Sequence, residues 1–259
     1  MADNELILTN VTKRFGGLTA VDALSMKVGS GQIYGVIGPN GAGKTTVFNC
    51  ITGIYKSEEG SVRWRDEEIR GKTPYQIVAR GIVRTFQTIR LFSQMSVAEN
   101  IMSGRHIKSS QGWWHGICPT PGSRRDEHDN WSKVGELLEF FGLEEVAATP
   151  TMSLPYGHQR RVEMARALAV DPTLLILDEP AAGLNDNETA ELVDIIFSIR
   201  KKGITVLLIE HDMDLVMKVT DYLTVLNFGK KIAEGTPDQI QKNPLVIEAY
   251  LGSEDEDDE

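Results

Sequence analysis

This chain has few cysteines, no long apolar run and no surplus of basic residues. The only two cysteines, Cys50 and Cys118, lie far apart in the sequence, so we expect no disulfide bond. Cys50 falls within a predicted helix, where a buried thiol acts as a small hydrophobic side chain. No apolar run approaches the roughly 20 residues needed to cross a bilayer. Residues 1–10 lack the basic start and apolar stretch of a signal peptide. These absences favour a cytoplasmic protein.

Acidic residues outnumber basic ones by 37 to 27, which gives a formal net charge of −10. Residues 254–259 are all acidic, and without them 31 acidic residues face 27 basic ones, a net charge of −4. A mildly acidic body argues against nucleic acid as the main partner. Residues 253–259 are predicted to form a disordered, solvated acidic tail. A regulatory or docking role for this tail is an alternative without support in the sequence.

The body of the chain alternates short apolar runs with helical patterns. Its 259 residues, 41% hydrophobic and 25% charged, suffice for one large domain or two modest ones. Helix starts are indicated by a capping residue followed three positions later by Gln or Glu, at Thr73, Ser96, Asn185 and Thr236. The predicted strands are residues 5–11, 24–28, 33–37, 61–65, 82–87, 173–177, 204–209 and 222–227. This alternation predicts an open, mostly parallel α/β sheet.

A glycine-rich loop, GPNGAGKTT, lies between the predicted strand 33–37 and a predicted helix at 45–51. Its spacing matches the phosphate-binding pattern Gly, four residues, Gly-Lys-Ser/Thr. Glycines permit backbone angles that side chains forbid, so the loop can wrap its N–H groups around a phosphate. Lys44 is expected to reach the outer phosphates, and the Thr45 hydroxyl to ligate Mg²⁺. The predicted nucleotide-binding residues are Gly38, Pro39, Asn40, Gly41, Ala42, Gly43, Lys44, Thr45 and Thr46. The alternative is a glycine-rich turn that merely precedes Lys-Thr.

Polar residues follow three other predicted strands: Gln87, the pair Asp178-Glu179, and His211. Ligands of parallel sheets bind beyond the carboxyl ends of strands, so these residues can meet at one nucleotide. Asp178 is expected to be the second Mg²⁺ anchor, and Glu179 to activate the water that attacks the γ-phosphate. His211 could contact the γ-phosphate, and Gln87 could complete the Mg²⁺ and water shell. The alternatives are solvated loop carboxylates and a structural histidine.

Two features remain open from the residues alone. Phe15 sits beside the predicted Gly16-Gly17 turn, where it could pack in a core or stack on a base. Residues 104–130 are irregular and contain Trp113 and Trp114, so we expect an insertion or a subdomain boundary there. The two tryptophans could make a protein contact or form a small satellite core. Helical spacing resumes at 131–141.

Together these residues resemble the ATP-binding subunit of an ABC transporter. The motifs occur in the family's order: the phosphate loop, Gln87 before a variable helical stretch, a signature segment at 154–161, Leu-Asp-Glu-Pro at 177–180, and His211. The resemblance covers residues 5–252. Within the family, the chain is most similar to the LivG-type subunit of branched-chain amino acid importers. That similarity lies in residues 14–18, 84–87, 90–92, 181–185, 209–213 and 249–252, and in the insert at 104–130.

The resemblance implies a P-loop NTPase fold of the RecA-like kind. Residues 1–87 and 160–252 would form the nucleotide-binding core with a small antiparallel β subdomain. Residues 88–159 would form an inserted α-helical subdomain that ends in the signature segment. Phe15 would then stack on adenine. The resemblance also implies the cofactors ATP and Mg²⁺, with Thr45, Gln87 and Asp178 as metal ligands.

The implied partners surround the nucleotide site. Two ATP-binding chains would pack head to tail, each ATP lying between one phosphate loop and the other chain's signature. The signature residues expected at that nucleotide are Leu154, Pro155, Tyr156, Gly157 and His158. Residues 88–95 would face two integral membrane permease subunits, which work with a substrate-binding protein. The chain would lie peripherally on the cytoplasmic face of the inner membrane.

The implied function is ATP hydrolysis that energises import of branched-chain or other hydrophobic amino acids. The signature departs from the family pattern, because Pro155 replaces the usual Ser and His158 the usual Gln. Proline offers neither a hydroxyl nor an N–H to a γ-phosphate, so we predict two unequal ATP sites in a dimer with a different second ATPase. Asn185 likewise replaces a more common aspartate. The alternatives are an exporter of the lipopolysaccharide type and a poorly hydrolysing, nucleotide-dependent switch. A soluble ABC ATPase acting on DNA or ribosomes is disfavoured by the acidic body and the single phosphate loop.

Overall fold

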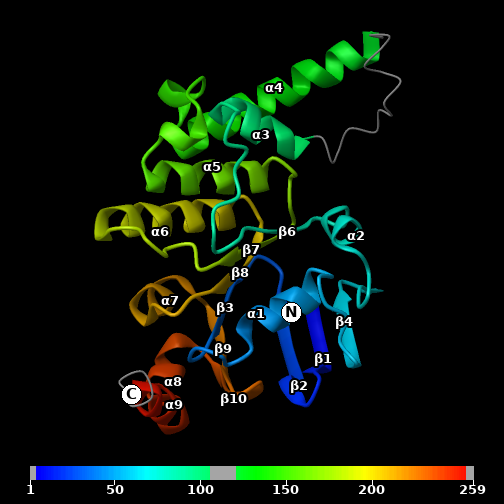
Figure 1. Ribbon diagram of the computed structural model, residues 1–259, viewed down its shortest axis with the longest axis vertical. Coiled ribbons are helices and arrows are strands. Elements are labelled where there is room, and N and C mark those ends of the chain that lie inside the picture. Colours follow the sequence, from blue (N-terminus) through cyan, green and yellow to red (C-terminus); the bar gives the residue numbers. More distant parts are fainter. Residues whose placement is uncertain (1–3, 106–120, 255–259) are drawn as a thin grey trace.

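The computed structural model describes residues 4–105 and 121–254, which contain two β-sheets (Figure 1). The larger sheet has the strand order β10-β9-β3-β8-β7-β6, and the smaller one β2-β1-β4-β5. The strands are β1 (Asn4–Phe15), β2 (Leu18–Gly29), β3 (Ile33–Ile37), β4 (Glu59–Trp64), β5 (Glu67–Glu68), β6 (Ile82–Arg84), β7 (Leu174–Asp178), β8 (Thr205–Ile209), β9 (Tyr222–Asn227) and β10 (Lys230–Gly235). In the larger sheet only the edge strand β10 is antiparallel, which confirms the predicted α/β sheet.

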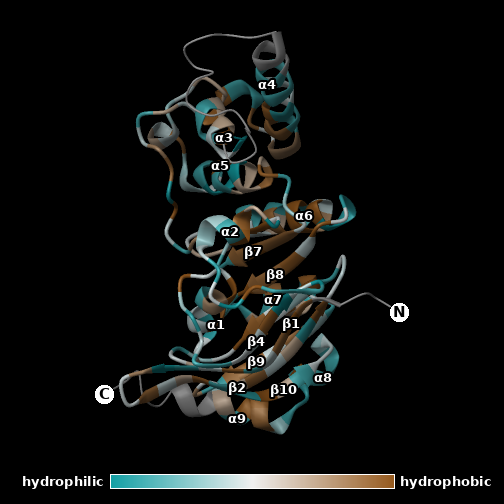
Figure 2. Cartoon of the chain, turned by 90° about the vertical axis from the view of Figure 1, so that its right-hand side faces the viewer, coloured by the Kyte–Doolittle hydropathy of each residue, from teal (hydrophilic) through white to brown (hydrophobic). Residues whose placement is uncertain are grey.

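The central strands β3, β7 and β8 are buried at every position, as expected of apolar strands covered on both faces. Figure 2 shows β7 and β8 as strongly hydrophobic. Successive residues point to opposite faces: Val36 belongs to a core shared with β1, β2 and α1, whereas Ile37 belongs to the core on the side of the helical layer. The larger sheet therefore separates two apolar cores.

The smaller sheet is built on a long β1–β2 hairpin whose turn places Gly16 at φ 57°. Both strands are longer than the predicted 5–11 and 24–28, and β1 also pairs antiparallel with β4. The predicted antiparallel β subdomain is confirmed. Its buried residues, such as Leu6 and Val21, pack against the helix that follows the phosphate loop.

The helices cover both sheets, and α3, α4 and α5 form a separate layer at one end of the molecule (Figure 1). The helices are α1 (Lys44–Ile51), α2 (Pro74–Val78), α3 (Val97–Arg105), α4 (Pro121–Phe141), α5 (Tyr156–Leu168), α6 (Asp186–Lys201), α7 (Met213–Val219), α8 (Pro237–Gln241) and α9 (Pro244–Glu254). Reciprocal capping boxes at Thr73, Ser96, Asn185 and Thr236 confirm all four predicted helix starts. Within the described ranges, no helix is both long and apolar enough to span a membrane.

The structure differs from the sequence predictions at several boundaries. Strand β6 ends at Arg84, so residues 85–87 form a loop rather than the end of a strand. Helix α4 begins at Pro121, so the last third of the stretch 104–130 is helical, not irregular; Trp113, Trp114 and Cys118 lie outside the described residues. The expected subdomain boundary at 159/160 falls inside α5, which packs on α3 and α4.

The structure also tests the predictions for the C-terminal tail and for Cys50. Helix α9 runs through Glu254, so residues 253–254 are helical and the predicted disordered tail begins too early. Residues 255–259 lie outside the described range. Cys50 is buried and carries a free thiol, as predicted.

Candidate nucleotide-binding and catalytic site

The phosphate loop connects the buried strand β3 to helix α1. All three of its glycines have positive φ angles, 149° at Gly38, 74° at Gly41 and 98° at Gly43. A Cβ atom at Gly38 would lie 2.1 Å from the Leu226 carbonyl oxygen, and one at Gly43 would lie 2.3 Å from the Ala20 carbonyl oxygen. Side chains at these two positions are therefore excluded by both conformation and space. Helix α1 begins at Lys44, so its free N–H groups and its positive end face the loop.

Lys44 lies inside this loop rather than in solvent. Its side chain is 8% exposed, and Nζ donates to the carbonyl oxygens of Gly38 and Pro39, the latter at 2.9 Å. Burial lowers the pKa of Lys44, and the charges of Glu179 and Asp178 oppose that effect. The ammonium group is thus held by the loop within the electrostatic influence of two carboxylates, and a bound phosphate would add a further negative charge.

A cavity of about 420 Å³ lies over the phosphate loop. It is lined by Phe15, Leu18, Thr19, Ala20, Asn40, Gly41, Ala42, Gly43, Lys44, Thr45, Thr46, Glu179, Phe228 and Gly229. Phe15 is 41% exposed and meets Tyr55 edge to face, with ring centroids 5.1 Å apart. Core packing is therefore the wrong interpretation of Phe15. Its ring lines the same cavity as the phosphate loop, on the side of the β1–β2 turn.

Glu179, Gln87 and His211 come together at the carboxyl ends of β7, β6 and β8. Gln87 Nε2 donates to Glu179 Oε2 at 2.7 Å, and His211 Nδ1 lies 3.9 Å from the same oxygen. Glu179 has a left-handed backbone with φ 45°, which a non-glycine residue adopts at a cost of about 1–3 kcal/mol. Its N–H donates to the Ile209 carbonyl oxygen at 2.9 Å, which fixes the strained residue to β8. The structure therefore unites three of the predicted catalytic residues.

Asp178 ends strand β7 and is paired with Arg84 at the end of β6. Arg84 Nη2 donates to Asp178 Oδ2 at 2.6 Å, and the side chains are 6% and 7% exposed. The hydroxyl of Thr45, the carboxylate of Asp178 and the amide oxygen of Gln87 are hard oxygen ligands of the kind that Mg²⁺ prefers. Thr45 lines the cavity together with Glu179, the neighbour of Asp178. This donor set fits the expected metal.

Arg160 is a buried residue that sequence reasoning missed. The residue is 1% exposed, and its guanidinium donates to the carbonyl oxygens of Phe86 (2.9 Å) and Gln87 (3.0 Å) and pairs with Glu163 at 2.9 Å. It also reaches the Tyr156 hydroxyl at 3.3 Å, so it joins the signature segment to the loop that carries Gln87. An Arg-Glu pair three residues apart on a helix is typical of a solvated surface, so the sequence contained no signal of this burial.

Glu210 is a second missed residue, placed between Ile209 and His211. It is 1% exposed; Oε1 accepts from the Ala181 N–H at 2.9 Å, and Oε2 accepts from the His211 N–H at 3.2 Å. Burial raises the pKa of Glu210, against the lowering effect of these backbone donors and of His211. The carboxylate therefore ties the loop after Glu179 to His211. An acid directly after a buried strand is the signal that could have revealed it.

The signature residues lie elsewhere in the chain's own fold. Leu154 and Gly157 are buried at the start of α5, Pro155 and Tyr156 are exposed, and His158 is half-buried. None of these five residues lines the cavity over the phosphate loop. Tyr156 packs beside Gly183, in the loop that follows Glu179. The structure therefore brings the predicted site residues into two groups: the phosphate loop with the catalytic junction, and the signature segment.

This geometry agrees with comparisons against known proteins. The family model described as ABC transporter matches residues 21–182, and the model described as branched-chain amino acid ATP-binding cassette transporter matches residues 230–256. The chain belongs to the ABC transporter family. As an ATP-binding cassette of that family, it is an ATPase with a P-loop NTPase fold. The sequence-based family assignment is confirmed.

Two curated relatives of this ABC cassette are similar over nearly their whole length. It is 46% identical to the high-affinity branched-chain amino acid transport ATP-binding protein BraF of Pseudomonas aeruginosa over 248 residues, which covers 95% of this chain and 97% of BraF. It is also 46% identical to LivG of Escherichia coli K12, which has the same descriptive name, over 253 residues, covering 97% and 99% of the two chains.

Solved structures extend the similarity to three dimensions. An ATP-binding cassette of an ABC transporter in its ADP conformation is 32% identical, with a TM-score of 0.82 and coverage of 96% of this chain and 99% of that one. A nucleotide-free ATP-binding cassette from an ABC transporter is 33% identical, with a TM-score of 0.83 and coverage of 95% and 98%. The ABC cassette therefore shares its whole architecture with these structures, not the phosphate loop alone.

Proposed function

We propose that this cassette is the ATP-hydrolysing subunit of an importer for branched-chain or other hydrophobic amino acids. The observation that carries the proposal is the near full-length similarity to BraF and LivG, including a C-terminal segment that matches a branched-chain amino acid family model. A phosphate loop alone would be compatible with many cargoes. The similarity across the helical layer and the C-terminus is more specific, because those parts do not build the phosphate site.

The site residues support in-line attack of water on the γ-phosphate of ATP. Lys44 and the N-terminus of α1 would bind the phosphates, and Phe15 would stack on adenine. Thr45, Gln87 and Asp178 would hold Mg²⁺, which when bound neutralises phosphate charge. Glu179 would accept the proton of the attacking water, and Gln87 and His211 would keep its carboxylate in place.

A second ATP-binding subunit would complete each site. The signature residues 154–158 lie apart from the cavity over the phosphate loop, so in a head-to-tail dimer they can face the partner's nucleotide. Pro155 precedes the first turn of α5 and offers no side-chain cap. A partner with a more usual signature would therefore give two unequal sites. Lys44→Ala and the matching partner substitution would then reduce ATPase activity unequally; equal losses would contradict the proposal.

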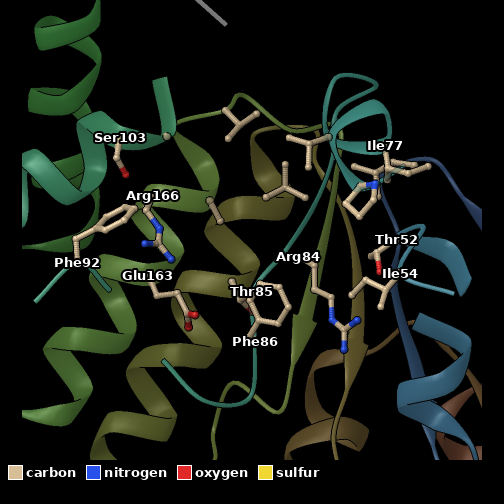
Figure 3. Close-up of a pocket in the computed structure, with 17 residues that line it drawn as sticks. Thr52, Ile54, Ile77, Arg84, Thr85, Phe86, Phe92, Ser103, Glu163 and Arg166 are labelled. Atoms are coloured by element: carbon tan, nitrogen blue, oxygen red, sulfur yellow. The ribbon is translucent and has the colours of Figure 1, made fainter. Parts of the chain in front are cut away.

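The membrane subunits would dock between the nucleotide-binding core and the helical layer. A mostly apolar cavity of about 330 Å³ lies there, with β6 and α2 on one side and α3 and α5 on the other (Figure 3). Phe92, in the loop 88–95 that follows Gln87, lines it and is 51% exposed. An apolar concavity of this size suits a short helix of a permease subunit. Such docking would hold the cassette on the cytoplasmic face of the inner membrane, with a substrate-binding protein on the opposite side.

Co-purification tests this function directly. A tagged Glu179→Gln form would be isolated from membranes with and without MgATP. We expect the Glu179→Gln form to recover two integral membrane proteins and a second, different ATPase. The same complex prepared with the wild-type chain should hydrolyse ATP in a way that depends on a branched-chain amino acid receptor. Recovery with ribosomes, with DNA or with lipopolysaccharide-export components would contradict the proposal.

A nucleotide-dependent switch that scarcely hydrolyses ATP is a second candidate, favoured by Pro155 in the signature. It would have the same membrane partners but a different use of ATP. Turnover measured beside ATP binding separates the two candidates. If the wild-type protein binds ATP but turns it over only after the Pro155→Ser substitution, the switch is favoured. If the wild-type protein turns ATP over and Pro155→Ser does not change the rate, the importer ATPase is favoured.

A further inference from the structure

Phe15, the proposed base-stacking residue, is contacted by two side chains that lie outside the nucleotide cavity. The Tyr55 ring meets it edge to face, with centroids 5.1 Å apart and an interplanar angle of 74°. The Lys13 ammonium lies over the Phe15 ring, 5.0 Å from its centroid. Phe15 lines the cavity over the phosphate loop, whereas Lys13 and Tyr55 are not among the described residues that line it. One part of the ring is therefore covered by the protein, and the part at the cavity is left for a ligand.

Lys13 is itself fixed at this position. Its side chain is 13% exposed, and Nζ donates to Glu58 Oε1 at 2.6 Å and to the Lys56 carbonyl oxygen at 3.1 Å. The other Glu58 oxygen accepts from the Arg14 N–H at 2.8 Å. The Lys13 ammonium, and after it the Arg14 N–H, lowers the pKa of Glu58, so the carboxylate stays charged at neutral pH. Glu58 therefore holds the end of β1 in place.

The segment that contains Tyr55 follows helix α1 closely in the chain. The Tyr55 N–H donates to the Asn49 carbonyl oxygen of α1 at 2.9 Å, and the Glu58 N–H donates to the Thr12 carbonyl oxygen of β1 at 2.9 Å. Residues 55–58 thus connect the helix whose N-terminus faces the phosphate loop with the strand that ends in the stacking ring. In the proposed function these two elements bind the triphosphate and the base of one nucleotide. The segment therefore fixes the base subsite relative to the phosphate subsite.

We propose that Tyr55 and Lys13 are positioning residues that hold the Phe15 ring for stacking on the base of the bound nucleotide. Phe15 is 41% exposed and lies beside the β1–β2 turn, where an unsupported ring would have to be ordered by the ligand at a cost in affinity. The edge-to-face contact with Tyr55 and the cation–π contact with Lys13 favour one orientation before the ligand arrives. Affinity for the base then depends on these two residues, whereas affinity for the triphosphate does not. The inference rests on the proposed function for the role of Phe15, so Phe15→Ala is measured beside the Tyr55 and Lys13 variants.

Calorimetric binding of two probes to the full chain tests this role. The probes are MgATP and inorganic tripolyphosphate with Mg²⁺, which has the phosphates but no base. We expect Tyr55→Leu to weaken ATP binding about fivefold, because part of the stacking is lost, and to leave tripolyphosphate binding unchanged. Tyr55→Phe, which keeps the ring, should bind ATP as wild type does. Lys13→Met should weaken ATP binding about twofold, and Lys13→Arg, which keeps the cation, should restore most of it.

Two substitutions elsewhere in the chain are matched controls. Tyr75→Leu removes an aromatic ring that is 70% exposed and outside the cavity. Lys72→Met breaks an ion pair with Glu67 of 3.0 Å, also outside the cavity. Both variants should bind ATP and tripolyphosphate as wild type does.

A double-mutant cycle separates positioning from a general loss of structure. In the Phe15→Ala background, Tyr55→Leu should weaken ATP binding no further, because there is no ring left to hold. An equal further loss in that background, or a matching loss of tripolyphosphate binding, would overturn the proposal, since Tyr55 would then support the whole site. Wild-type ATP affinity of Tyr55→Leu, with Phe15→Ala weakened, would overturn the positioning role and leave the proposed function standing. Wild-type ATP affinity of Phe15→Ala would contradict base stacking and the positioning role together.

Discussion

The phosphate loop and the catalytic junction lie at the same edge of the larger sheet but are built in different ways. The loop consists of nine consecutive residues, and its shape depends on glycines at three of them. The junction joins Gln87, Glu179 and His211, three residues from three different strand ends. A contiguous loop depends on local conformation, whereas the junction depends on strand order. The two regions should therefore respond differently to substitution.

Substitution of Lys44 tests the loop and should have the largest effect. Lys44→Ala removes the one ammonium group that is buried in the phosphate loop, so we expect ATPase activity to fall by at least about a hundredfold. ATP binding, measured by calorimetry, should weaken as well. Lys56→Ala, a surface lysine outside the cavity, is the control. Strong residual hydrolysis in Lys44→Ala would show that the loop does not bind the transferred phosphate.

Substitution of Glu179 tests the junction and should separate chemistry from binding. Glu179→Gln keeps the shape of the side chain but removes its basicity, so we expect hydrolysis to fall about a hundredfold or more while ATP affinity changes little. Single-turnover hydrolysis and equilibrium binding measure the two quantities. If binding and hydrolysis fall together, Glu179 contributes to nucleotide binding, and the contrast between loop and junction is weaker than we infer.

Arg160 tests how much the junction depends on tertiary contacts. Arg160→Met would leave the Glu163 carboxylate buried without its cation and release the carbonyl groups of Phe86 and Gln87, so the free energy of unfolding should fall by about 3–5 kcal/mol. Urea unfolding measures this change. Arg161→Met is the matched control: the neighbouring arginine pairs with the exposed Glu191, and its loss should cost less than about 1 kcal/mol.

Phe15 tests whether the cavity binds a base as well as phosphates. If Phe15 stacks on adenine, Phe15→Ala should weaken ATP binding about tenfold, whereas Phe15→Tyr should bind ATP as wild type does. Tyr75→Ala, which removes an aromatic ring that is 70% exposed and outside the cavity, is the control. Equal ATP affinity of Phe15→Ala and wild type would exclude the stacking role.

Glu210 should show the smallest effect, and it depends on pH. Because burial raises the pKa of Glu210, the folded state holds this proton more tightly than the unfolded state does. Its stabilising contribution is present at pH below the ordinary carboxyl range and is lost as pH rises through the raised value. Glu210→Gln should remove this part of the pH dependence of the unfolding free energy between pH 4 and pH 8. An unchanged pH profile would show that Glu210 ionises normally.

The sequence by itself determined the phosphate loop, the strand–helix alternation and several helix starts. Each of these depends on residues close together in the chain: glycines that tolerate positive φ angles, apolar runs of strand length, and capping residues three positions from Gln or Glu. It also indicated which polar residues follow strand ends. That is why Gln87, Glu179 and His211 could be proposed together before their contacts were known.

Only the tertiary structure decided which groups hold these residues in place. Arg84 and Asp178 are 94 residues apart in the chain, and Arg160 and Gln87 are 73 apart, so neither contact leaves a local pattern. Burial of Arg160, Glu163 and Glu210 likewise results from packing, because the same residue types in the same spacing are usually solvated. Consecutive residues determine local backbone geometry. A buried charged group, in contrast, acquires its partner and its raised or lowered pKa only when the fold removes water from it.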